Sequence, residues 1–228
     1  WAAGLSLECF GVRIGIRFTS EADRPAIERC LPPGWVAAPS DEVEHLFSLR
    51  LASPSADPRV RSYHLLFHNL QRRARTLSSD EALATLESEL QLCVGEWAPD
   101  RVFVHAGVVA HAGRALLLPG LSFAGKSTLV KELLAAGAEY LSDEFAILDE
   151  QGYVHPYPRR LALRRRGGVD RRTATELGGR VGTRPLPVGA VAHLRYHPEG
   201  GTHLRRLAPG RAILELLGHA LAAHRDPP

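Results

Sequence analysis

The sequence lacks methionine altogether and holds only three cysteines among its 228 residues. Cys9, Cys30 and Cys93 are scattered, no pair of them has the spacing of a metal site, and their odd number leaves no complete disulfide framework. We therefore expect free thiols and a cytoplasmic location, where thiols stay reduced.

Long apolar segments are missing too. The longest candidate, residues 115–118, has the length of a strand, whereas a membrane-spanning helix needs about 20 apolar residues. The N-terminus also lacks a charged segment followed by an apolar stretch, so we expect no signal peptide and no membrane partner.

What is present is the ordinary composition of a globular protein, with 45% hydrophobic and 23% charged residues and a net charge of +3. The length suits one large domain or two small ones. The pattern changes near residue 100, so we expect an α/β protein with a strand-rich, mixed α/β region over residues 1–98 and a nucleotide-binding core over residues 99–228.

Period-two and helical patterns predict the elements of the first region. Alternating apolar residues predict strands over residues 5–10, 12–18, 45–51 and 62–68. A helix is expected to begin near Ser20 and to end before the Pro-Pro-Gly segment at 32–34, and an amphipathic helix is expected over residues 79–97.

The second region shows shorter apolar runs. They predict strands over residues 102–105, 107–110, 115–118, 140–142, 145–149 and 188–196. Gly113 predicts a tight turn at 111–114, because glycine accepts a positive φ. Helices are expected over residues 128–136 and 211–223.

A phosphate-binding motif stands between the predicted strand at 115–118 and the helix that follows. It matches G-x-x-x-x-G-K-[ST] without a gap, and the nucleotide-contacting residues that it predicts are Gly120, Leu121, Ser122, Phe123, Ala124, Gly125, Lys126, Ser127 and Thr128. Backbone N–H groups and the helix N-terminus would hold a phosphate there. A glycine-rich turn without a ligand is the alternative.

The chemistry of this motif points to a nucleoside triphosphate such as ATP, together with Mg²⁺. The Lys126 ammonium can reach the β- and γ-phosphates, and the Ser127 hydroxyl can ligate the Mg²⁺. Asp143 and Glu144 follow at the predicted end of the next strand. One carboxylate can hold Mg²⁺ with Ser127 while the other accepts a proton; two solvated acids at a strand end are the alternative.

Two further features leave alternatives open on spacing alone. His105 lies 15 residues before Gly120, and a lone histidine is more often structural than functional. A basic run holds seven arginines, opposed only by Asp170: Arg159, Arg160, Arg164, Arg165, Arg166, Arg171 and Arg172. It indicates either an anionic partner or a solvated surface or loop. We do not expect nucleic acid, because no aromatic residues alternate with these arginines.

These motifs together resemble a known family. The segment from His105 to Val109, the phosphate loop and the segment from Leu141 to Glu144 resemble the catalytic domain of HPr kinase/phosphorylase. They are more similar still to the divergent HPr-kinase-like proteins found beside peptide-modification genes, including lasso-peptide kinases. The resemblance covers about residues 101–160, so it does not include the first hundred residues.

The resemblance implies a P-loop kinase core with a fold akin to phosphoenolpyruvate carboxykinase, and phosphoryl transfer to a hydroxyl. It implies that Asp143 is the catalytic base and that His105 is its histidine neighbour. With Asp143 as the base, Glu144, an aspartate in the bacterial enzyme, is the acid left to hold Mg²⁺ with Ser127. The stretch from Pro156 to Arg159 resembles one in the divergent proteins, which makes Arg159 the phosphate-facing arginine.

Two functions follow as hypotheses. The first is an ATP-dependent kinase for a hydroxyl of a peptide, protein or small molecule, with the basic run binding an anionic acceptor. The second is a nucleotide-binding regulatory or assembly module without transfer activity, since a phosphate loop can be retained after catalytic activity is lost. Homo-oligomerisation stays open.

Overall fold

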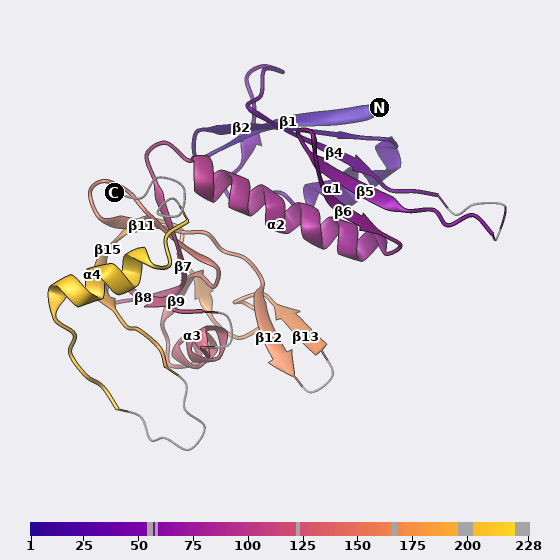
Figure 1. Cartoon of the computed structure of the whole chain (residues 1–228). Coiled ribbons are helices and arrows are strands. Elements are labelled where there is room, and N and C mark those ends of the chain that lie inside the picture. The colour runs from indigo at the N-terminus through magenta and orange to yellow at the C-terminus, as the bar shows by residue number, and fades with distance from the viewer. Residues whose placement is uncertain (54–56, 58, 122–123, 166–167, 196–202, 222–228) are drawn as a thin grey trace. The chain divides into compact units, whose positions relative to one another are not determined.

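The computed structural model describes residues 1–53, 57, 59–121, 124–165, 168–195 and 203–221. The chain divides into two compact units, Trp1–Pro99 and Asp100–Pro228. Each combines strands with helices, so the chain is mixed α/β (Figure 1).

The first unit contains a 6-stranded sheet with the strand order β3-β1-β2-β4-β5-β6. Its elements are β1 (Ala3–Cys9), β2 (Val12–Phe18), η1 (Glu21–Asp23), α1 (Arg24–Glu28), β3 (Val36–Ala37), β4 (His45–Arg50), β5 (His64–His68), β6 (Gln71–Thr76) and α2 (Ser79–Trp97). Neighbouring strands are antiparallel except for the parallel pair β2 and β4.

Helix α2 covers part of this sheet. Its N-cap is Ser78, whose side chain accepts a hydrogen bond from the Glu81 amide. The helix contacts β5 and β6 and buries Leu86, Leu90 and Cys93. The predicted helix at 79–97 is therefore confirmed, and its apolar stripe faces the sheet as amphipathic spacing requires.

Beyond shifts of one or two residues at the ends of β1, β4 and β5, the structure differs from the predictions in this unit at the helix after Ser20 and at β3 and β6. The helix expected from Ser20 to the Pro-Pro-Gly segment is shorter, because a 3₁₀ turn precedes α1 and α1 ends at Glu28. Strand β6 was not predicted, because its residues are mostly polar and four of its six are exposed. It forms an edge of the sheet, where arginine side chains can remain in solvent.

The second unit contains a 7-stranded sheet and a separate two-stranded one. Its elements are β7 (Val102–His111), β8 (Arg114–Pro119), α3 (Lys126–Ala135), β9 (Glu139–Ser142), β10 (Phe145–Leu148), β11 (Tyr153–His155), β12 (Leu161–Arg165), β13 (Gly168–Arg172), β14 (Arg180–Val181), β15 (Leu186–Val191) and α4 (Pro209–Leu217).

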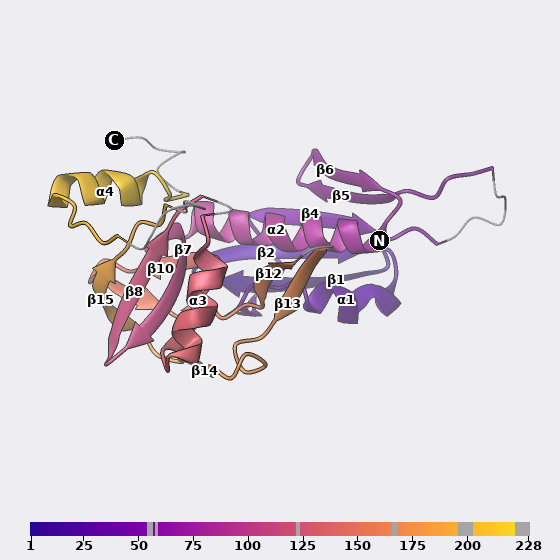
Figure 2. The same cartoon turned by 90° about the horizontal axis from the view of Figure 1, so that it is seen from below.

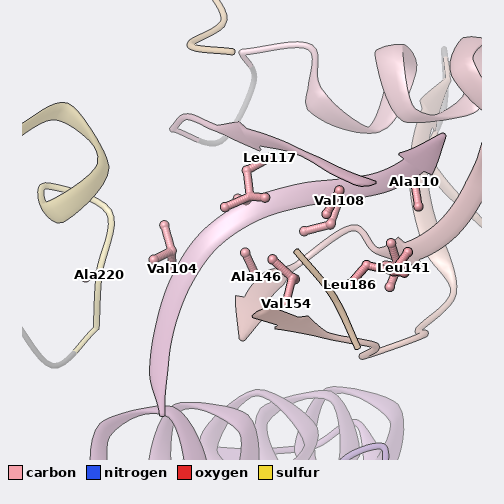
Figure 3. Packing of buried hydrophobic residues seen from close by; sticks show 11 residues of the cluster. Val104, Val108, Ala110, Leu117, Leu141, Ala146, Val154, Leu186 and Ala220 are labelled. Carbon is pink, nitrogen blue, oxygen red and sulfur yellow. The ribbon is translucent and has the colours of Figure 1, made fainter. Parts of the chain in front are cut away.

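Five strands of this sheet close on themselves. In the order β7, β8, β15, β11 and β10, each strand pairs with the next, and β10 pairs again with β7. Alternate side chains of β7 and β8, including Val104, Val108 and Leu117, point into the enclosed core with residues of the other strands (Figure 3). This apolar interior fixes which face of β7 points outward.

Helix α3 covers the opposite face of the β7–β8 hairpin (Figure 2). Val130 and Leu134 of the helix pack with Val109, Leu118 and Tyr140 of the strands. The hairpin turn places Ala112 and Gly113 at positive φ, as the sequence predicts for Gly113. The phosphate motif therefore connects a strand and a helix that are fixed to one another by a buried cluster.

Several predicted boundaries in this unit are wrong. Strand β7 is continuous from Val102 to His111, because Ala106 alternates inward like its neighbours, although the Ala106-Gly107 pair resembles a break. Helix α3 begins at Lys126 rather than at 128, and α4 spans 209–217 rather than 211–223; residues 222 and 223 lie outside the described residues. Strand β15 spans 186–191 rather than 188–196, and residue 196 also lies outside them.

The basic run forms a β-hairpin rather than a loop. Strands β12 and β13 pair from Leu161 opposite Arg172 to Arg165 opposite Gly168. Leu161 and Leu163 bury themselves against the cluster around α3, which anchors the hairpin. Arg166 and the side chains of Arg164 and Arg165 lie outside the described part of the chain.

Among the described residues, no helix is long and apolar enough to span a membrane. Cys9, Cys30 and Cys93 are buried and form no disulfide, as the sequence predicts.

Candidate phosphate-binding and catalytic site

Three polypeptide segments meet at one end of the β7–β8 pair. Strands β8 and β9 both run antiparallel to β7, on its two sides, so their carboxyl ends lie at the same edge. The phosphate motif leaves β8 there, and Asp143 and Glu144 follow β9 there. Because β7 lies between these strands, His105 is flanked by both segments: its neighbour Ala106 pairs with Pro119, and His105 itself pairs with Phe145.

The loop enters α3 through Gly125. This residue is the N-cap of the helix and has a φ of 91°, in the left-handed region that favours glycine. The first amides of α3 have no acceptor within the helix, so they are available to an anion at this end. Of the predicted contact residues, Gly120, Leu121 and Ala124 to Thr128 are described, while Ser122 and Phe123 lie outside the described residues.

Lys126 is held at the centre of the loop. Its side chain is only 7% exposed, and Nζ donates hydrogen bonds to the carbonyl oxygens of Gly120 at 2.7 Å and Leu121 at 3.0 Å. Burial lowers the pKa of the ammonium, while Asp143 and Glu144 act in the opposite direction. A phosphate that enters the loop would replace these carbonyl contacts with contacts to its own oxygens.

Asp143 is buried beside the start of the same helix. It is 8% exposed, and its Oδ1 atom is fully buried without a hydrogen-bond partner. Burial raises the pKa of this carboxyl to about 6 and Glu144 adds to the rise, while the Ser127 side chain, Lys126 and the Ala162 amide lower it. A carboxylate with a pKa near neutrality and an unpaired oxygen is suited to accept a proton.

Glu144 is placed differently from its neighbour. The Ser142 hydroxyl accepts hydrogen bonds from the amides of Glu144 and Phe145, which fixes the turn between β9 and β10. Glu144 Oε1 lies 3.8 Å from His105 Nε2. Burial lowers the pKa of His105 to about 4, with Lys126 and His219 contributing, so the imidazole is neutral at pH 7 and this contact is not an ion pair.

Two residues of the site were not predicted from the sequence. A Cβ atom at Gly107 would lie 2.8 Å from Val130 Cγ2, so glycine lets the strand and helix α3 approach this closely, and it would lie 3.7 Å from Asp143 Oδ1, at ordinary van der Waals distance. His219, at the end of α4, accepts a hydrogen bond from the His105 amide through its carbonyl oxygen at 2.8 Å. Gly107 could have been noticed as a glycine between apolar strand residues. His219 lies more than a hundred residues from His105 in the sequence, and no such local feature marks it.

Arg159 and the basic hairpin also lie close to this site. Tyr140, on β9, donates a hydrogen bond of 2.8 Å from its hydroxyl to the Arg159 carbonyl oxygen. The Ala162 amide, on β12, is near enough to Asp143 to affect its pKa. The structure thus brings Lys126, Ser127, Asp143, Glu144 and His105 together and attaches the arginine-rich segment beside them.

The oxygen atoms of this site fit a magnesium ion. Mg²⁺ prefers oxygen ligands and is usually held by one or two carboxylates together with phosphate oxygens. The buried Asp143 has one oxygen, Oδ1, without a hydrogen-bond partner. The metal ligands predicted from the sequence are Ser127, whose side chain hydrogen-bonds to Asp143, and Glu144, whose carboxylate lies beside His105; these two residues would hold the ion.

Comparison with protein-family models, with curated protein sequences and with solved structures finds no match for this chain. The function proposed below therefore depends on the site itself and on the resemblance carried by its motifs.

Proposed function

We propose that the chain is an ATP-dependent phosphotransferase, a kinase that phosphorylates a hydroxyl of a peptide, protein or small molecule. The observation that carries the proposal is the position of Asp143, which is buried beside Ser127 and Lys126 and has a pKa of about 6. A turn that only binds phosphate does not require a buried carboxylate, and burying one costs stability. A buried carboxylate with a raised pKa at this position is therefore typical of a catalytic site. The resemblance to the HPr-kinase-like proteins supports the same function.

In this proposal the nucleotide binds at the start of α3. The amides of the loop and of the helix N-terminus hold the β-phosphate, and the Lys126 ammonium neutralises charge on the β- and γ-phosphates. When bound, Mg²⁺ at Ser127 and Glu144 would neutralise the remaining phosphate charge. Arg159 is the candidate for a further cation on the phosphate side.

The chemical step is a direct transfer. The Asp143 carboxylate accepts the proton of the acceptor hydroxyl, the hydroxyl oxygen forms a bond to the γ-phosphorus, and the bond from that phosphorus to the β–γ bridging oxygen breaks. The products are a phosphate monoester and ADP, and the proton on Asp143 passes to solvent. Neutral His105 borders the acidic pair without adding a positive charge that would lower the basicity of Asp143.

The experiment is a transfer assay with ATP labelled on the γ-phosphate and a panel of hydroxyl acceptors, including acidic and neutral serine peptides. We expect label on at least one acceptor, and we expect Lys126→Ala to abolish transfer and to weaken ATP binding measured by calorimetry. Lys131→Ala, an exposed lysine on the same helix, is the matched control.

The assay also decides between the two hypotheses. If the wild-type chain binds ATP but labels no hydroxyl acceptor, the nucleotide-binding module without transfer activity becomes the better explanation. If Lys126→Ala binds ATP as the wild type does, the site assignment itself fails.

A further inference from the structure

Three potential metal ligands meet in the first unit, far from the phosphate motif in the sequence. They are His45 on β4, His68 at the end of β5 and Cys93 on α2. One ligand atom from each lies within 4.8 Å of those of the other two. Their separation along the chain gave no metal-ligand spacing, so the sequence predicted no metal site here, and only the fold brings them together.

The fold explains why these side chains face one another. Phe47 pairs with His68 across β4 and β5, so the two side chains stand on the same face, and their rings stack with centroids 4.3 Å apart. His45 precedes Phe47 by two residues and therefore points to this face as well. Helix α2 covers the face and contributes Cys93 and Trp97, whose ring lies 4.8 Å from that of His45.

The distances suit a tetrahedral ion. His45 Nδ1 and His68 Nε2 are hydrogen-bonded to one another at 3.2 Å. Two nitrogens bound to one tetrahedral zinc ion are about 3.3 Å apart, so a zinc ion would replace this hydrogen bond with little movement of the two nitrogens. A nitrogen and a thiolate on the same ion would be about 3.6 Å apart. The three ligand atoms therefore reach the spacing of a tetrahedral zinc site if the Cys93 sulfur or one imidazole ring moves by about 1 Å. A side-chain rotation is enough for a movement of this size.

The surroundings of the cluster also suit a bound ion. His45 and Cys93 are 5% and 2% exposed, so an ion there would be shielded from most of the solvent. A metal that binds the Cys93 sulfur would displace its thiol proton.

We propose that His45, His68 and Cys93 form a binding site for a zinc ion, with one nitrogen of each ring and the Cys93 sulfur as ligands. Mixed nitrogen and sulfur ligands select zinc and similar transition metals over Mg²⁺ and Ca²⁺. Three protein ligands leave one tetrahedral position for water. The inference does not depend on phosphoryl transfer, because every residue that it uses lies in the first unit.

Cobalt titration of the metal-free full chain tests this site. We expect one equivalent of Co²⁺ to bind, with a thiolate-to-cobalt charge-transfer absorption, quenching of the neighbouring Trp97 fluorescence and displacement by Zn²⁺. Cys93→Ser should lose the absorption and weaken Co²⁺ binding by at least about 100-fold, since removal of even an indirect partner of a ligand costs 10–100-fold. Cys30→Ser, a buried cysteine of the same unit, should bind as the wild type.

A second variant separates loss of the ligand from loss of the fold. His68 is only partly buried, so His68→Asn should retain the wild-type circular dichroism while losing most of the Co²⁺ affinity. Absence of a thiolate absorption in the wild type would overturn the proposal. So would wild-type affinity in both Cys93→Ser and His68→Asn, or binding of Cu(I) alone without Zn²⁺ or Co²⁺.

Discussion

Asp143 is the residue on which the functional argument depends most. The sequence placed an acidic pair at the end of a strand, and the structure shows that the two members differ. Asp143 is buried beside Ser127, while Glu144 is partly exposed beside His105. The identity of each acid can be read from the motif, but its burial cannot, because groups around Asp143, such as Gly107 and the Ala162 amide, come from other elements.

The burial of Asp143 predicts a stability effect with a defined sign. Its pKa in the folded chain is about 6, above the ordinary aspartate value of 3.8, so the folded state binds more protons between these values and stability falls as pH rises through that window. We expect Asp143→Asn to be more stable than the wild type at pH 7 by on the order of 2 kcal/mol. The difference should shrink toward zero as the pH falls to about 4.

Urea unfolding at pH 7 and pH 4, followed by circular dichroism, measures this difference. Tryptophan fluorescence is unsuitable, because Trp1, Trp35 and Trp97 all lie in the first unit. Asp149→Asn is a contrasting variant: its pKa is lowered, chiefly through the side chain of His155, so its loss should destabilise at pH 7. A less stable Asp143→Asn at pH 7 would show that the carboxylate is not strained by burial.

At the scale of elements, the strand, loop and helix of the phosphate motif depend on the backbone of Gly125. A residue other than glycine in the left-handed region costs roughly 1–2 kcal/mol, and a Cβ atom at Gly125 would meet no atom within 4 Å. We expect Gly125→Ala to destabilise by this amount and to weaken ATP binding about tenfold, equivalent to about 1.4 kcal/mol.

Gly113→Ala is the matched control for this prediction. Gly113 has a φ of 74°, also has open space around it, and lies in the β7–β8 turn, at the opposite end of the hairpin from the loop. It should cost similar stability and leave ATP affinity unchanged. Equal ATP affinity in Gly125→Ala and the wild type, measured by calorimetry, would contradict a role for the loop in binding.

The β12–β13 hairpin gives a prediction about the acceptor. Arg160 and Arg171 are exposed, and Arg171 pairs with Ala162, whose amide lies near Asp143. We expect Arg160→Glu combined with Arg171→Glu to raise KM for an acidic acceptor peptide several-fold and to leave KM for ATP unchanged. Added salt should imitate the substitutions, because exposed charges are screened.

Arg205→Glu combined with Arg206→Glu makes the same change in net charge outside the hairpin, on exposed residues, and should leave acceptor KM unchanged. If the hairpin variant behaves like this control in steady-state kinetics, the arginines of β12 and β13 are only a solvated face.

The elements show where sequence patterns succeed and fail. Gly113 and the apolar residues of β8 gave the hairpin turn and the strand before the loop, because local backbone preference decides both. The β12–β13 hairpin was not predicted as strands. Leu161 and Leu163 have the period-two spacing of a strand, but they stand among so many arginines that the segment does not show an apolar pattern. Leu161 and Leu163 anchor the hairpin by packing against the cluster around α3, and such a tertiary contact cannot be read from the local sequence.

At the scale of the whole molecule, the chain carries two candidate sites in two units. The phosphate site uses residues between His105 and His219, and the His45–His68–Cys93 cluster uses residues before Pro99. The second unit was recognisable from a contiguous motif. The cluster was not, because its members come from three elements spread over about half of the first unit, and such separation leaves no spacing to detect.

This division predicts separate responses to ligands in hydrogen exchange. ATP with Mg²⁺ should slow exchange in the amides at the start of α3 and in the turn after β9. Zinc should slow exchange in β4, β5 and the second half of α2, because a ligand protects the segments that it binds. Protection of α2 by ATP as strong as that of the loop would contradict the assignment of nucleotide binding to the second unit alone.

The role of Asp143 as the catalytic base is tested by comparing ATP affinity with single-turnover transfer in Asp143→Asn and Glu144→Gln. We predict that Asp143→Asn keeps ATP affinity within about tenfold but lowers transfer by about 100-fold or more. Wild-type transfer should fall as the pH drops below about 6, where Asp143 becomes protonated. Glu144→Gln should instead raise the Mg²⁺ concentration required. Transfer by Asp143→Asn at the wild-type rate, with an unchanged pH profile, would contradict the account.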